Sequence, residues 1–141
     1  MPYSTKFSSL SIGNRIIDSE HEKLSGVING MSNLILVNHA VALSVQFKIL
    51  DNCLRNYFLL EESIARAASF DFTNHKLAHQ LLLHKCKSIQ DKMMNKEGNW
   101  TKFERDDCID SLNDFLIQHV KWDSAPLKKV LDTFPYDFKP S

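Results

Sequence analysis

Polar side chains interrupt several apolar stripes of this chain, and their types are those of metal ligands. The stripes are marked by apolar residues that recur every three or four positions. At several positions where the next apolar residue is expected, an imidazole, carboxylate or phenol stands instead: His21, Tyr57, Glu61, His75, His79, His119 and Asp123. Imidazoles and carboxylates without thiolates suit iron, manganese or zinc. The sequence therefore points to a buried metal site.

Four blocks of helical spacing must position these side chains. Steps of three and four keep side chains on one face of an α-helix. They predict helices at roughly 14–37, 41–69, 74–95 and 103–123, with a C-terminal tail at 124–141. Four helices with short connections favour an all-α fold, an up-down-up-down antiparallel four-helix bundle. In that fold the polar positions of all four helices fall at the same end, so we expect them to meet at one level of the core.

A bound cation accounts for this layer better than unaided burial does. No Lys or Arg lies on the stripes to neutralise the two carboxylates. Burying an ionised carboxylate without a partner costs several kcal/mol, which is large beside a net stability of about 5–15 kcal/mol. Six donors exceed the four of a tetrahedral zinc site. Two metal ions with bridging carboxylates and terminal histidines therefore fit the set best.

Composition excludes several other classes of protein. The 141 residues match the usual size of one domain, and we expect a single domain over 1–141. The chain carries 17 Lys+Arg and 17 Asp+Glu, a balance that argues against nucleic-acid binding. The most hydrophobic stretch, 28–43, contains too many polar residues for a membrane span. Three scattered cysteines favour a reducing compartment, so we expect a cytoplasmic protein.

Four separated segments carry a more specific pattern. They read IGNRIIDSEHEKL at 12–24, YFLLEE at 57–62, HKLAH at 75–79 and FLIQHV at 115–120. In this order they resemble the hemerythrin family, specifically a bacterial hemerythrin-like domain, over about residues 7–131. The Glu-x-x-His motif of the ferritin-like di-iron proteins is absent, because Ile64 follows Glu61 by three residues.

The resemblance implies a non-haem di-iron site that binds O2, with two iron ions bridged by an oxo or hydroxo group and by carboxylates. By the family pattern the metal ligands are His21, Glu61, His75, His79, His119 and Asp123. The last three histidines of this set hold one iron, His21 and a histidine of the second helix hold the other, and the two carboxylates bridge them. The positions that line the apolar O2 pocket are matched by Leu24, Phe58, Phe115, Leu116 and Val120, which suit an ordinary bundle core equally well.

The chain departs from the family pattern at two positions. Tyr57 stands where the second helix has its histidine, and it would bind ferric iron as phenolate, hydrogen-bond a bound ligand, or fill space. The family's aspartate follows its histidine by five residues, whereas Asp123 follows His119 by four and Ser124 takes the fifth place. These two places differ by about 100° around an α-helix. A tightened last turn or a shifted helix end would still bring Asp123 to the bridge.

The resemblance predicts an O2-binding protein for storage, delivery or sensing, without an enzymatic reaction. One alternative is an altered di-iron site that reacts as an enzyme with O2, peroxide or nitric oxide. Another is an interaction module whose metal site has degenerated to a single ion or to zinc. The expected ligand is O2 or another small diatomic or peroxide molecule. A signalling partner or a second copy of the chain would be its protein partner.

Overall fold

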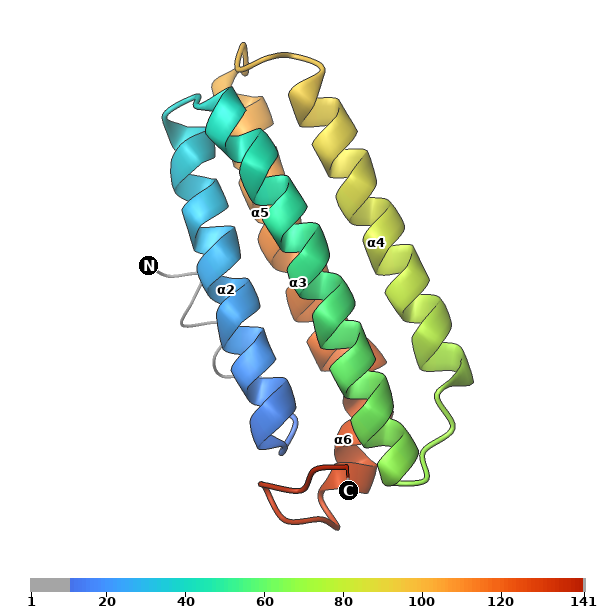
Figure 1. Ribbon diagram of the computed structural model, residues 1–141. Helices are drawn as coiled ribbons and strands as arrows, with labels where there is room; N and C mark the ends of the chain where they lie inside the picture. The colour runs from blue at the N-terminus through green and yellow to red at the C-terminus, as the bar shows by residue number, and fades with distance from the viewer. Residues whose placement is uncertain (1–10, 141) are drawn as a thin grey trace.

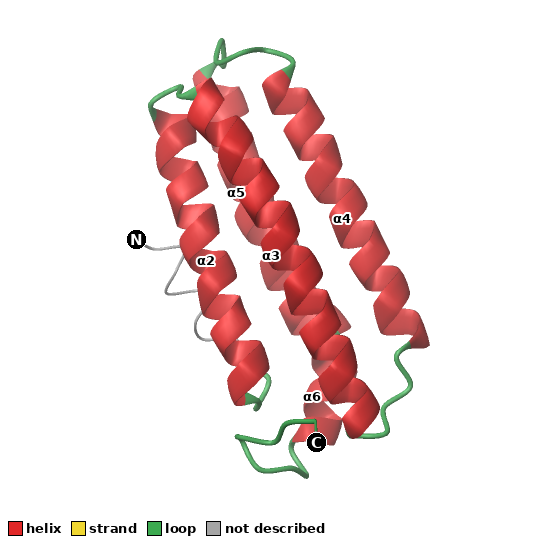
Figure 2. Ribbon diagram, viewed as in Figure 1, coloured by secondary structure: helices red, strands yellow, loops and turns green. Residues whose placement is uncertain are grey.

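The computed structural model describes residues 11–140, and every regular element in that range is helical (Figures 1 and 2). The elements are α2 (Arg15–Leu36), α3 (Ala40–Ala67), α4 (Thr73–Met94), α5 (Lys102–Gln118), the π-helix η1 (His119–Asp123) and α6 (Ala125–Leu131). The four long helices lie side by side, and the chain reverses direction at each connection (Figure 1). The all-α prediction is confirmed. Residues 1–10 and 141 of the predicted domain lie outside the described residues.

The helices begin where side chains satisfy the first backbone N–H groups. The Asn14 side chain accepts hydrogen bonds from the N–H groups of Ile16 and Ile17 at the start of α2. At the start of α5, Thr101 and Glu104 form a reciprocal capping box. Such caps contribute about 1 kcal/mol each. The first three predicted helices agree with the observed ones to within two residues at each end.

The fourth predicted helix, 103–123, is where the structure differs. The α-helix ends at Gln118, and the chain continues through the π-helix η1 before α6 begins. In η1 the N–H of Ser124 donates to the carbonyl of His119, five residues back, at 3.0 Å. This wider turn adds one residue to the ordinary four-residue spacing and changes which side chains face the core.

Apolar side chains from all four long helices fill the core. Ile28 and Met31 of α2, Phe47 and Leu54 of α3, and Leu112 of α5 are each at most 1 % exposed. Burying such a side chain contributes about 1.5–3 kcal/mol. This packing holds the helices in register, so that the polar residues near the ends of α3 and α5 lie opposite those at the starts of α2 and α4.

The C-terminal segment closes the polar end of the bundle. The Arg15 N–H donates to the carbonyl of Tyr136 at 2.8 Å, and the Asn14 side-chain amide donates to that of Phe138 at 2.9 Å. The tail predicted at 124–141 therefore contains the short helix α6 and is tied to the start of α2. It lies at the same end as the last turns of α3 and the first turns of α2 and α4 (Figure 1).

Candidate metal centre

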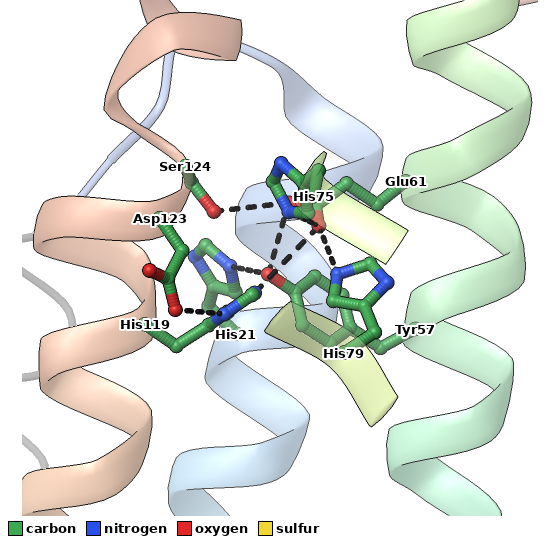
Figure 3. Close-up of polar contacts among 8 residues, drawn as sticks. All are labelled: His21, Tyr57, Glu61, His75, His79, His119, Asp123 and Ser124. Carbon is green, nitrogen blue, oxygen red and sulfur yellow. Dashed lines mark hydrogen bonds and ion pairs between the residues drawn. The ribbon is translucent and has the colours of Figure 1, made fainter. Parts of the chain in front are cut away.

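Three histidines and one glutamate form a buried cluster at this end of the helices (Figure 3). Glu61 comes from the last turns of α3, His75 and His79 from the first turns of α4, and His119 from η1. Their ligand atoms all lie within 4.8 Å of one another, and each residue is at most 5 % exposed. We call these four residues the Glu61 cluster.

The three imidazoles of the Glu61 cluster turn their Nε2 atoms toward one carboxylate oxygen. The distances to Glu61 Oε1 are 2.6 Å from His75 Nε2, 2.7 Å from His79 Nε2 and 3.8 Å from His119 Nε2. Donors bound at about 2.0–2.2 Å from one metal ion lie roughly 3.0–3.4 Å from their neighbours. Small movements of the side chains would therefore seat all four atoms around one ion.

Two of these nitrogens contact the Glu61 carboxylate without a well-directed hydrogen bond. His75 Nε2 and His119 Nε2 have no hydrogen-bond partner of good geometry among the described residues, although both are buried. Buried polar atoms are nearly always satisfied, because an unmade hydrogen bond costs about 1–3 kcal/mol. A metal ion at the centre of the cluster would use both nitrogens, so the donor set fits a metal.

Aromatic rings shield the Glu61 cluster. Phe58 stacks on the ring of His79 with centroids 3.8 Å apart, and Phe72 stacks on His75 at 4.6 Å. These contacts limit the rotation of both imidazoles. They also lower the local dielectric constant, which strengthens the attraction between a bound cation and the glutamate.

The charges of the cluster are already paired without a metal. Burial alone would raise the pKa of Glu61, but the contacts with His119, His75 and His79 outweigh it and hold that pKa well below its usual value. Burial also opposes protonation of His119, yet its contacts with Asp123 and Glu61 raise its pKa to about 9. Burial lowers the pKa of His79. Without a metal, an ionised Glu61 therefore faces a protonated His119, and a divalent cation would displace that proton.

Asp123 does not join the cluster, which differs from its predicted role as a bridging ligand. Its Oδ2 lies 3.1 Å from His119 Nδ1, on the far side of the ring from Nε2, and its side chain is 45 % exposed. The turn widens instead of tightening, so the fully buried side chain at this end of η1 is that of Ser124. A carboxylate in this position holds the proton on His119 Nδ1, and His119 Nε2, which points at Glu61 Oε1, would then be available to a metal ion.

His21 and Tyr57 lie beside the cluster and are connected to it by hydrogen bonds. Tyr57 donates to Glu61 Oε2 at 2.9 Å, and His21 Nε2 lies 3.1 Å from the same phenol oxygen. Ser124 Oγ also donates to Glu61 Oε2, at 3.3 Å. Burial and the neighbouring Glu61 raise the pKa of Tyr57 well above its usual value, so it is a neutral phenol. Burial lowers the pKa of His21 to about 4.

Sequence reasoning gave no role to Ser124 or to Phe72. The signal for Ser124 was its position five residues after His119, where the family pattern expects an acidic ligand. The signal for Phe72 was its position three residues before His75 on the same apolar stripe, but its stacking on the imidazole was not predicted.

The residues predicted to line an O2 pocket are mostly core residues. Leu24, Leu116 and Val120 are at most 4 % exposed, and Phe58 is 7 % exposed. Phe115 instead lines an open groove of about 520 Å³ between α4 and α5, which reaches the His119 side of the cluster.

A second groove, of about 360 Å³, lies between α3 and α4. It is lined by Phe58, Phe72 and His79, among other residues. Each of the two grooves therefore borders one histidine of the cluster.

Comparisons with known proteins find no similar protein for this chain. No protein-family model, no curated protein and no solved structure matches the chain. Among the described residues 11–140, no helix combines the length and apolar character needed to cross a membrane.

Proposed function

We propose that this chain is a hemerythrin-like four-helix-bundle protein that binds iron through the Glu61 cluster and takes up O2 or a related small molecule there. The resemblance of the four sequence segments supports the family. The convergence of three Nε2 atoms on Glu61 Oε1 supports the metal, and it is the observation that carries the proposal. Reversible uptake of O2 would serve storage, delivery or sensing.

The donor set favours iron with an exchangeable ligand. Several imidazoles and one carboxylate are typical of non-haem Fe(II) sites that keep open positions. Four protein ligands leave up to two positions of a six-coordinate ion for small molecules. When bound, iron would supply a redox-active centre with these open positions. The two grooves border His119 and His79, and we propose that such molecules approach the ion from them.

Zinc is the second candidate, because four ligands also complete a tetrahedral zinc site. A zinc ion held in this way would stabilise the bundle without taking up a further ligand, and the domain would act as an interaction module. The two candidates differ in one measurable property. Iron in the cluster would bind nitric oxide or O2, and closed tetrahedral zinc would bind neither.

The decisive experiment combines metal analysis with a test of ligand binding. Purified protein is loaded with Fe(II) without air and then titrated with nitric oxide and, separately, with O2, followed by absorption and electron paramagnetic resonance spectra. We expect bound iron, spectral changes with both gases, and recovery of the starting spectrum when O2 is removed. His79→Ala should abolish iron binding. His84→Ala, an exposed histidine on the same helix, is the matched control and should retain it.

Two results would contradict the proposal. If the wild-type protein binds no iron under these conditions, the proposed iron site is wrong. If it binds zinc in preference to iron and binds neither gas, the interaction module is favoured. Turnover of O2, peroxide or nitric oxide at a steady rate would instead identify an enzyme.

A further inference from the structure

The second carboxylate oxygen of Glu61, Oε2, faces side chains that donate hydrogen bonds to it. Glu61 Oε2 accepts hydrogen bonds from the Tyr57 hydroxyl at 2.9 Å and from Ser124 Oγ at 3.3 Å. Both donors are fully buried, as is the carboxylate. Glu61 therefore has two distinct sides, with imidazoles at Oε1 and hydroxyl donors at Oε2 (Figure 3).

The direction of these hydrogen bonds determines which ring nitrogen of His21 carries its proton. A phenol has one O–H group, and that of Tyr57 donates its hydrogen bond to Glu61. The contact between His21 Nε2 and the phenol oxygen, at 3.1 Å, must then be a bond that His21 donates. The proton of His21 therefore sits on Nε2, and that nitrogen has no lone pair directed at the site.

A second metal ion would need ligands that this side does not offer. A carboxylate bridges two ions when each of its oxygens has a lone pair directed at one of them, but two hydroxyl donors occupy Glu61 Oε2. The nearby carboxylate that could add negative charge, Asp123, is bound to the outer nitrogen of His119. On this side of Glu61 the described side chains of His21, Tyr57 and Ser124 thus present N–H and O–H groups, and not the lone pairs that a second cation would need.

We propose that the chain binds a single metal ion, and that Tyr57 and Ser124 are positioning residues that exclude a second one by holding Glu61 Oε2. The sequence predicts two ions, and the arrangement of these donors is the reason for the difference. The inference rests on the proposed function, since it requires an ion in the Glu61 cluster. It assigns Tyr57 to hydrogen bonding with a ligand residue instead of to coordination.

The test measures the number of ions for each chain. Metal-free protein is titrated with Fe(II) alone and, separately, with Co(II) alone, and bound metal is quantified after removal of the excess. We expect one ion for the wild type. Tyr57→Phe should also bind one ion, about 10-fold more weakly, because losing a hydrogen bond to a ligand residue typically lowers metal affinity about 10–100-fold. Tyr136→Phe, which removes the hydroxyl of a half-exposed tyrosine outside the site, should match the wild type in both number and affinity.

A double variant tests the exclusion directly. Tyr57→His together with Ser124→Asp replaces both hydroxyl donors with metal ligands, and we expect it to bind two ions. The same double variant with a single bound ion would overturn the role of these two residues. Circular dichroism confirms that each variant is folded. If the double variant is not, an unchanged metal affinity of Tyr57→Phe would overturn the positioning role of Tyr57.

Spectra of the ferric protein provide an independent readout. If Tyr57 only hydrogen-bonds Glu61, the wild type shows no phenolate-to-iron absorption band. Such a band, lost in Tyr57→Phe, would overturn the inference, and so would two ions in the wild type. A wild type without any ion would overturn the proposed function as well, so the two failures are distinguishable.

Discussion

Removal of the Glu61 charge should abolish the stabilisation of the protein by metal. The change is Glu61→Gln, which keeps the size of the side chain but removes its negative charge. Glu61 is completely buried and supplies the one anionic donor of the cluster. We expect the variant to fold without metal and to show almost no change in melting temperature when metal is added.

The size of the effect follows from the geometry. A single negative charge about 2 Å from a divalent ion is worth about 4 kcal/mol even with the screening of bulk water, or roughly a thousandfold in affinity. With free metal at about 100 times the wild-type Kd, binding stabilises the wild type by about 2.7 kcal/mol. At about 4 °C for each kcal/mol, the wild-type melting temperature rises by roughly 11 °C. At the same metal concentration the variant gains less than about 0.1 kcal/mol.

Thermal unfolding in buffered Fe(II), without air, measures both proteins. The matched control is Glu62→Gln, which removes the next carboxylate on α3, a partner of Arg66 at 3.5 Å outside the cluster. The control should keep the full rise in melting temperature. If Glu61→Gln keeps it too, the metal is bound elsewhere and the reasoning from the cluster is wrong.

Three further changes test the core, the orientation of His119 and a helix cap. Leu50→Ala removes a fully buried side chain and should lower the free energy of unfolding by about 2–5 kcal/mol in urea. Asp123→Asn weakens the contact with His119 Nδ1 and should reduce metal affinity about 10–100-fold at unchanged stoichiometry, as measured by competition with a coloured chelator. The contact with Lys96 and the cap of α5 lower the pKa of Glu104 from 4.5 to about 2. Its stabilisation is therefore complete above pH 4.5 and lost as the pH falls toward 2, and Glu104→Gln should reduce the slope of unfolding free energy against pH in that window.

Each of these predictions has a control or an outcome that would contradict it. Ile49→Ala, at a 39 % exposed position next to Leu50, should cost much less than the buried change. Asp114→Asn removes an exposed carboxylate from the same groove as Asp123 and should leave metal affinity unchanged. An identical pH slope with and without the Glu104 carboxylate would show that the cap contributes nothing in acid.

Much of the fold could be predicted from the spacing of apolar residues. Residues such as Ile28, Phe47 and Leu54 lie on the buried faces that the spacing indicates. This works because burial of one helix face is a property of the helix itself, with a period that the chain shows directly. The end of the fourth helix could not be predicted in the same way. Whether a last turn closes with four or five residues depends on contacts with neighbouring helices, not on local periodicity.

The residues of the candidate site were likewise predicted from the sequence only in part. Glu61, His75, His79 and His119 were predicted as ligands, and the structure brings their donor atoms together. Asp123 was predicted to bridge two ions, and it lies instead against the outer nitrogen of His119. The three alternatives for Tyr57 could not be separated from the sequence, because each needs the position of its hydroxyl relative to Glu61.

The amino-acid sequence alone is enough to predict that the chain forms long amphipathic helices and that imidazoles and carboxylates occupy core positions near one end of them. Residue type and period are enough for that, since they specify which groups are buried together. Which of those groups face one another depends on how the helices pack in three dimensions. The widened turn at η1, the placement of Ser124 and the direction of the Tyr57 hydrogen bond depend on distances of a few ångströms between separate helices. Those distances are set by packing, and they determine which donors remain free to hold a metal.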